Sequence, residues 1–221
     1  MFPSLSEGLD EAYNHLSGFC EHVEFIPIPS ESNDYGKHLL AIKSLFSKTP
    51  YTINWLKSES MQKAIVNCLD DTKFDLVHFD TISLAPYISL FGQIPKVLDH
   101  HNIESHMMIR RSQQEKNLLK KIYFYQEGIK LLKYEKRICQ NFELHITCSS
   151  LDSNRLKHID HSLNIDEIPN GVDVNYFSPE LYGSSNNRLV FAGGLSWYPN
   201  KDAMLFFTEN IWPLLKKKCP N

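Results

Sequence analysis

The chain has 221 residues, of which 42% are hydrophobic and 12% aromatic, and its formal net charge is −3. This composition is typical of a folded globular protein, and the charge excludes a general attraction to nucleic acid. The five cysteines lack C-x-x-C spacing, no signal-peptide pattern follows Met1, and the longest apolar runs are too short to span a bilayer. We therefore expect a cytoplasmic protein with reduced thiols and no metal site.

The N-terminal third of the chain alternates between helical and extended patterns. Apolar residues at helical spacing predict a helix over residues 7–19. Residues 22–28 have the composition of a strand that ends at proline breakers. Two further helices are expected, a basic amphipathic one over 37–47 and another over 58–69.

The middle of the chain continues this alternation, which favours an α/β fold built on a parallel sheet. Short apolar runs predict strands at residues 74–79, 96–99, 144–148 and 165–168. A long helical pattern covers residues 115–140, where Gly128 is expected to bend the helix, and a shorter helix is expected at 152–157.

The C-terminal region begins after a turn at Asn170-Gly171, for which we expect a positive φ at the glycine. Residues 1–178 are predicted to form one domain, residues 179–187 a polar linker, and residues 188–221 the start of a second domain. This second part is expected to consist of one strand, a glycine loop and a helix over 201–217. Its predicted buried residues are Ala203, Phe206, Phe207 and Ile211.

Polar side chains follow three of the predicted strands. His78 and Asp80 come at the end of one strand, the run from Asp99 to Ser105 follows the next, and Ser149 follows a third. Because ligands of open parallel sheets bind beyond the carboxyl ends of the strands, we expect these residues to share one rim.

Several motifs together resemble family 4 glycosyltransferases. The Ile168–Asp173 segment reads I-P-N-G-V-D, as at the junction between the two domains of that family, and Phe191-Ala192-Gly193-Gly194-Leu195 is similar to the F-x-G-x-L opening of the second domain. The Asp99–Arg111 turn and the W-x-P-N-x-D-A sequence of Trp197–Ala203 also match family patterns. The resemblance implies a GT-B architecture, with an acceptor-side Rossmann-like parallel sheet followed by the first βα unit of a second Rossmann-like domain.

The same resemblance implies an activity and a set of site residues. The expected reaction transfers a sugar from a nucleotide diphosphate donor to a sugar or lipid-linked acceptor hydroxyl, with retention, in polysaccharide or glycolipid biosynthesis. It requires neither metal nor cofactor. His78 would be catalytic. The acceptor-side residues would be Asp80, His101, Asn102, Glu104, Arg110 and Ser149, and the donor-side residues would be Gly193, Gly194, Asn200 and Lys201.

The chain departs from the family pattern in ways that bear on activity. Gly194 stands where the family has a diphosphate-binding arginine, and the paired-glutamate motif of the donor domain does not occur. The chain also opens in a helix instead of a strand and glycine turn. We therefore expect an incomplete enzyme, lacking the first βα unit and most of the donor domain, that is inactive alone.

Other interpretations stay open for several residues and for the function. Asn102, Glu104 and Ser149 could cap helices, and His78 could be structural. His100 and His101, being adjacent in a strand, should point to opposite faces, so a shared metal is not expected. The chain could instead be a non-catalytic binding module or a sugar-nucleotide epimerase of the same fold.

The helix over residues 37–48 has two possible environments. It could lie on an anionic membrane or pack on the sheet as an ordinary amphipathic helix. Its basic side comprises Lys37, His38, Lys43 and Lys48, and its apolar side comprises Leu39, Leu40, Ile42, Leu45 and Phe46.

Overall fold

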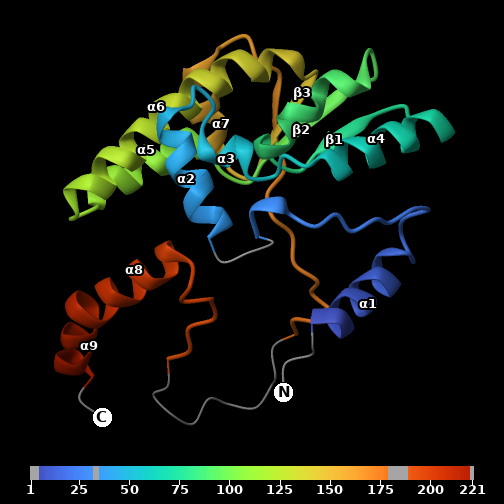
Figure 1. Cartoon of the computed structure of the whole chain (residues 1–221). Helices are drawn as coiled ribbons and strands as arrows, with labels where there is room; N and C mark the ends of the chain where they lie inside the picture. Colours follow the sequence, from blue (N-terminus) through green and yellow to red (C-terminus); the bar gives the residue numbers. More distant parts are fainter. Residues whose placement is uncertain (1–4, 32–34, 179–188, 220–221) are drawn as a thin grey trace. The chain divides into compact units, whose positions relative to one another are not determined.

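The computed structural model describes residues 5–31, 35–178 and 189–219 (Figure 1). They belong to two compact units, Met1–Gly171 and Val172–Asn221, which are described separately below as unit 1 and unit 2. The predicted linker over 179–187 lies outside the described residues.

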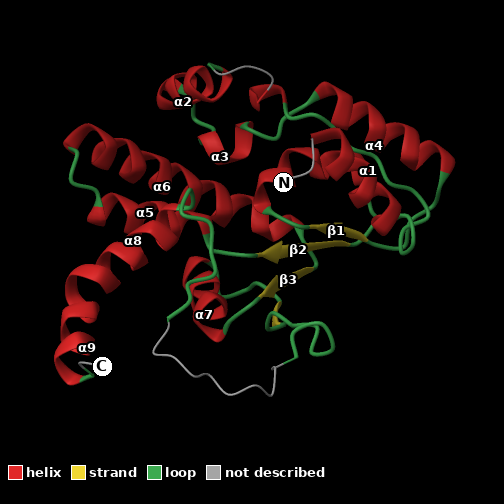
Figure 2. Ribbon diagram, turned by 90° about the horizontal axis from the view of Figure 1, so that it is seen from below, coloured by secondary structure: helices red, strands yellow, loops and turns green. Residues whose placement is uncertain are grey.

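Unit 1 contains a four-stranded parallel sheet in the order β1-β2-β3-β4 (Figure 2). The strands are β1 (Val77–Phe79), β2 (Lys96–His100), β3 (Leu144–Thr147) and β4 (Ile165–Glu167). All three pairings are parallel. The predicted α/β class with a parallel sheet is therefore confirmed, and the fold is Rossmann-like in a broad sense.

Helices connect the strands and flank the sheet. Ser58, Asn117 and Ser149 are N-caps whose side chains accept a backbone N–H of the helix that follows. The helices of unit 1 are α1 (Leu5–Leu16), α2 (Gly36–Phe46), α3 (Tyr51–Asn54), α4 (Glu59–Asp71), α5 (Glu104–Gln114), α6 (Leu118–Ile138) and α7 (Ser150–Ile159), with 3-10 segments η1 (Pro29–Glu31), η2 (Ile82–Phe91) and η3 (Cys139–Asn141).

The two faces of the sheet differ in burial. Register places Phe79 opposite Leu98 and Leu98 opposite His145, and all three are buried on one face. The core on this face includes Leu131 of α6 and Leu156 of α7, both fully buried. On the opposite face His78 is exposed. The core therefore lies mainly on one side of the sheet.

Helix α6 confirms the long helix expected over residues 115–140. A second helix, α5, precedes it and forms a hairpin with it. Helix α5 ends at Gln114, because the backbone of Glu115 is extended. Asn117 then caps α6. A Cβ at Gly128 would lie 2.7 Å from Ile109 Cγ1 and 3.1 Å from the Ile109 backbone nitrogen. Gly128 therefore lets the two helices approach closely.

Two local expectations for unit 1 are wrong. Residues 22–28 form no strand, because the prolines within and after the segment remove N–H donors and no neighbouring strand pairs with it. Among the described residues, Gly92 is the one with a positive φ (49°), so the turn at Gly171 does not use that conformation.

The described residues of unit 2 form coil followed by one interrupted helix. The helix runs through α8 (Tyr198–Phe206), a π-helical turn η4 (Phe207–Ile211) and α9 (Trp212–Lys218). Pro213 cannot donate a backbone hydrogen bond, and the wider π turn precedes it.

The described part of unit 2 differs from the predicted βα unit. Residues 189–192 are coil, because a single extended segment has no partner strand there. The expected burial of Ala203, Phe206, Phe207 and Ile211 is also wrong: Phe207 is half-buried and the other three are exposed.

Gly128→Ala should lower the free energy of unfolding by about 1–3 kcal/mol, because the backbone of Ile109 cannot move away from the new methyl group. This loss outweighs the helix-propensity gain of about 1 kcal/mol. Gly8→Ala in α1, where no atom lies within 4 Å of the new Cβ, is the matched control and should not lower stability. Urea unfolding measures both, and equal effects would contradict close packing at Gly128.

Candidate functional site

Two histidine–carboxylate pairs lie at the carboxyl ends of β1 and β2. His101 Nε2 is 3.0 Å from Asp80 Oδ1, and His78 Nε2 is 3.8 Å from Asp99 Oδ2. All four side chains retain solvent exposure. The structure thus brings together three of the predicted site residues, His78, Asp80 and His101.

The parallel register explains why these groups meet. His78 is paired with Val97, so Asp99, two residues further along β2, projects from the same face of the sheet as His78. Asp80 and His101 each come directly after their strands and join the two strand ends. Asp99 was not among the predicted site residues, although the alternation of side chains in paired strands could have identified it.

Two titratable groups near this rim have raised pKa values. The hydrogen bond with Asp80 raises the pKa of His101, and the nearby charges of Asp80 and Asp99 raise it further. Burial raises the pKa of Glu104 to about 7, although the charge of His101 opposes this shift. A carboxyl group whose pKa lies near neutrality can exchange protons with a bound hydroxyl group.

The start of α5 is held by a residue that the sequence analysis missed. Ile103 is the N-cap and offers no side-chain bond, so Asn102 and Glu104 do not cap the helix. Instead, the buried Glu135 of α6 accepts the backbone N–H of Ser105 at 3.0 Å and also its hydroxyl. Asn102 is exposed. No sequence pattern near residue 104 indicates that Glu135 holds the start of α5.

A chain of buried hydrogen bonds fixes the end of β2 from the core side. His145 Nε2 lies 3.0 Å from the Cys139 carbonyl oxygen, and His145 Nδ1 lies 3.0 Å from His100 Nε2. Because the carbonyl can only accept, neutral His145 donates from Nε2 and accepts from His100 at Nδ1. His100 thus points into the core and His101 outward, as expected from strand alternation.

These same residues form a group of metal-capable side chains. His100, His145 and the Cys139 thiol offer ligand atoms within 4.8 Å of one another. Both ring nitrogens of His145 already have protein partners, and burial raises the pKa of the Cys139 thiol far above neutrality. The arrangement therefore fits a hydrogen-bonded chain better than a thiolate metal site.

Ser149 and Arg110 lie outside the paired cluster. The Ser149 hydroxyl accepts the Asp152 backbone N–H at 3.2 Å and donates to Asp152 Oδ2 at 2.9 Å, so it caps α7. Arg110 is exposed on α5, where its charge contributes to lowering the pKa of His106 behind the larger effects of burial and Arg155. Neither residue contributes a described contact to the histidine–carboxylate pairs.

The predicted donor-side residues lie in unit 2. Asn200 Nδ2 donates to the Gly194 carbonyl oxygen at 3.1 Å and folds back over the loop. A Cβ at Gly193 would meet Asn200 Nδ2 at 2.9 Å and the Phe191 ring at 3.0 Å, which explains the glycine without a ligand. Lys201 is exposed.

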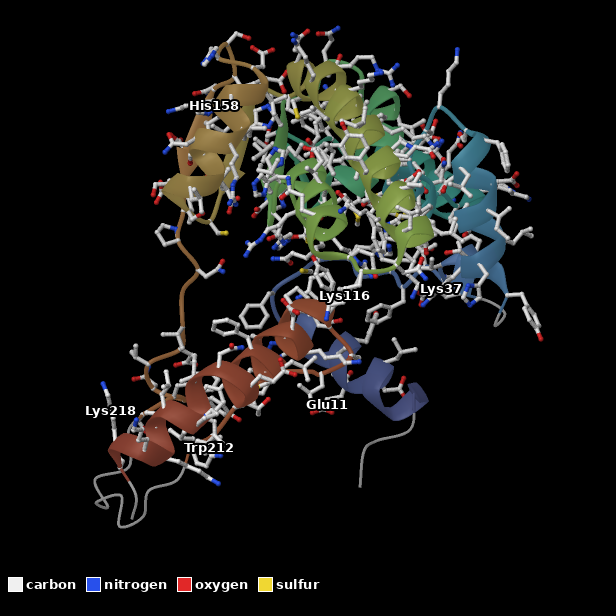
Figure 3. The ribbon with its side chains drawn as sticks, turned by 90° about the vertical axis from the view of Figure 1, so that its left-hand side faces the viewer. Glu11, Lys37, Lys116, His158, Trp212 and Lys218 are labelled. Atoms are coloured by element: carbon white, nitrogen blue, oxygen red, sulfur yellow. The ribbon has the colours of Figure 1, made fainter. Side chains whose placement is uncertain are left out.

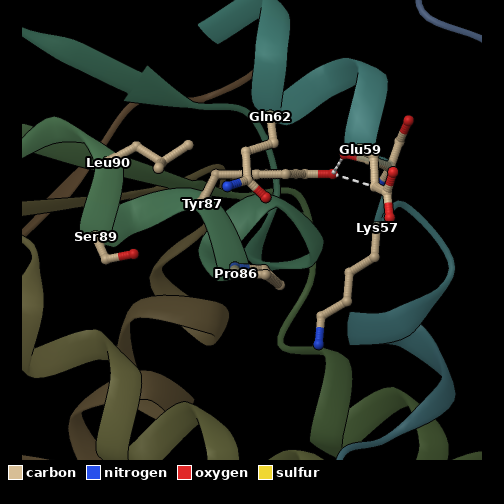
Figure 4. A pocket seen from close by; sticks show the side chains of 8 residues that line it. Lys57, Glu59, Gln62, Pro86, Tyr87, Ser89 and Leu90 are labelled. Carbon is tan, nitrogen blue, oxygen red and sulfur yellow. Dashed lines mark hydrogen bonds between the residues drawn. The ribbon is translucent and has the colours of Figure 1, made fainter. Parts of the chain in front are cut away.

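A separate pocket of about 270 Å³ opens between α4 and η2 (Figure 4). Its central polar group, the Tyr87 hydroxyl, accepts the Ser58 backbone N–H and donates to the Leu56 carbonyl, both at 2.7 Å. These bonds anchor η2 to the start of α4, so the pocket's main polar group already serves the fold.

Comparisons with known proteins give no match: no family model, curated protein or solved structure corresponds to this chain. In the described part of the chain, no helix combines the length and apolar character needed to cross a membrane. A functional proposal therefore rests on the geometry of the cluster together with the sequence motifs.

Asp80→Asn should lower the pKa of His101 toward the ordinary value of 6.5, because the hydrogen bond to the carboxylate is the largest cause of its elevation. Titration of the His101 ring Cε1–H signal by NMR measures this change. Asp75→Asn, which neutralises an exposed carboxylate before the same strand, is the control. An unchanged His101 titration in Asp80→Asn would contradict the pairing.

The contribution of His100 to stability should fall as the pH drops below 6.5, because burial lowers its pKa to about 3 in the folded state, whereas the raised pKa values of Glu104 and Glu135 act in the opposite direction. The unfolded chain then takes up a proton first, which removes up to about 1.4 kcal/mol per pH unit. His100→Gln preserves a donor to His145 and should weaken this pH dependence. His158→Gln, at an exposed position on α7, should not. Urea midpoints between pH 7 and pH 4 test the difference, and parallel curves for wild type and His100→Gln would refute it.

Proposed function

We propose that unit 1 is the acceptor-binding side of a glycosyltransferase that uses a nucleotide diphosphate sugar. The observation that carries the proposal is the cluster of His78, Asp80, Asp99 and His101 at the carboxyl edge of a parallel sheet. This edge is where open α/β sheets bind their ligands. The motif resemblance in the sequence supplies the reaction class, with retention at the anomeric carbon.

The proposed chemistry uses these groups to receive an acceptor hydroxyl. In the transfer, the bond from the anomeric carbon to the diphosphate breaks, a bond to the acceptor oxygen forms, and the hydroxyl proton leaves. His78 lies at the exposed rim and is the proposed catalytic contact to that hydroxyl. Glu104, whose pKa burial raises to about 7, is suited to take up the proton near neutral pH, and His101 lies at the same rim beside Asp80.

A non-catalytic acceptor-binding module is the second candidate. The donor-side loop makes its contacts within unit 2, where Asn200 bonds to Gly194, and the described residues of that unit contain no sheet. On this alternative, unit 1 binds a carbohydrate without transferring one. An epimerase would be distinguished by conversion of one nucleotide sugar into another without any acceptor.

NMR of the histidine rings offers a direct test of acceptor binding. Oligosaccharides and a short-chain diphosphate-linked sugar should shift the ring signals of His78 and His101, which lie at the exposed rim. The signals of the buried His100 and His145 should hold their positions. His101→Gln should weaken binding by about tenfold, the scale of one charge-assisted hydrogen bond.

The control variant for this test is His158→Gln, which removes an exposed histidine on α7. It should bind the acceptor like the wild type. Failure of every acceptor to move the His78 and His101 signals would refute the proposal. Calorimetry with nucleotide sugars should show weak binding at most, and micromolar binding would show that the donor site is more complete than proposed.

A further inference from the structure

The end of the α5–α6 hairpin exposes a group of large apolar side chains. Leu118, Leu119, Ile122 and Tyr125 have exposed fractions from 55% at Ile122 to 79% at Leu119. Leu118, Ile122 and Tyr125 follow one another at helical spacing and therefore share one face of α6. Such a stripe normally faces the core of a globular protein.

The fold does not use this stripe. The inward face of α6 carries the buried residues Phe124, Leu131 and Glu135, and Gly128 on that side meets Ile109 of α5. Arg111 of α5 also stacks over the Phe124 ring, with its guanidinium carbon 3.9 Å from the ring centroid. The hairpin is therefore held together by its other face, and the apolar stripe is available to a partner.

Helix α2 presents a second exposed apolar face. Leu39, Ile42 and Phe46 lie at helical spacing, with exposed fractions from 54% to 89%. The opposite side of α2, where Ser44 is buried, faces α6: Lys130 Nζ donates to the Ser44 carbonyl at 2.5 Å, and Gln126 Nε2 donates to the Leu45 carbonyl at 2.8 Å. These bonds join α2 to α6, so the two exposed faces lie on helices of unit 1 that contact each other.

Positive charge accompanies both faces. Residues 35–48 contain three lysines and no acidic residue, and residues 110–125 contain five basic residues and one acidic residue, in a chain whose net charge is −3. Two of these charged residues have partners. Glu115 accepts the Asn117 backbone N–H, and Lys37 pairs with Glu31 at 2.8 Å. Figure 3 shows Lys37 of α2 and Lys116 of the hairpin turn along the same edge of unit 1 in that view.

We propose that unit 1 docks on an anionic lipid surface through the hairpin end and the outer face of α2. Exposed leucines flanked by lysines match the acyl boundary and the acidic headgroups of such a surface. The charge excess on these two segments favours a lipid surface over a second copy of the chain, which would place like charges together. This docking does not depend on the proposed sugar transfer.

Co-sedimentation with vesicles tests the proposal on the whole chain. Vesicles of phosphatidylcholine with phosphatidylglycerol should bind the protein, vesicles of phosphatidylcholine alone should bind it much less, and high salt should release it. Lys120→Gln and Lys121→Gln should each weaken partitioning about fivefold. Leu118→Gln with Leu119→Gln should weaken it by about tenfold or more. Ile42→Gln with Phe46→Gln tests the α2 face in the same way.

The matched control is Leu151→Gln with Lys157→Gln, at exposed positions of α7. These changes should leave vesicle binding unchanged, and far-UV circular dichroism verifies that every variant is folded. Equal vesicle binding by the hairpin variants and the α7 control would overturn the proposal, as would no binding to anionic vesicles. A dimer in gel filtration that the hairpin variants dissociate, without any vesicle effect, would identify a contact between copies and would likewise overturn it.

Discussion

Two buried carboxylates on α6 organise the helices of unit 1. Glu135 accepts the Ser105 N–H at the start of α5, and Glu127 accepts the Tyr51 N–H at the start of α3 at 2.6 Å. Each replaces a local N-cap with a residue distant in sequence. Burial raises the pKa of Glu135 to about 7, so its neutral form is favoured below that pH. The hydrogen bonds from Ser105 lower the pKa and so oppose this shift. The position of α5, and with it the turn that carries His101, depends on this contact.

The hydrogen-bonded chain from Cys139 through His145 to His100 acts on the same turn from the core. It fixes the ring of His100 inside the sheet, so the next residue, His101, must point outward toward Asp80. Neutral histidines suit this role because each offers one donor and one acceptor, and burial keeps both uncharged. The core and the rim of the sheet are therefore coupled through two neighbouring residues.

Sequence reasoning succeeded where a local pattern sufficed. The four paired strands, the helices α2, α4 and α7, and the Ser149 cap follow from short-range periodicity and capping chemistry. It failed where a partner is distant. The expected strands at 22–28 and 189–192 lack neighbouring strands, and α5 is capped by Glu135, thirty residues beyond Ser105. The close contact between Gly128 and Ile109 could not be predicted either, because only the folded hairpin brings the two residues together.

The sequence by itself determined the α/β class and which strands are followed by polar side chains. It also determined that His100 and His101 point in opposite directions, because these features depend on periodicity within single strands. Only the tertiary structure decided that Asp99 joins His78, that Glu104 titrates near neutral pH, and that Leu118, Leu119, Ile122 and Tyr125 stay exposed. Register, desolvation and helix packing arise between segments far apart in the chain. Their consequences therefore cannot be read from any one segment.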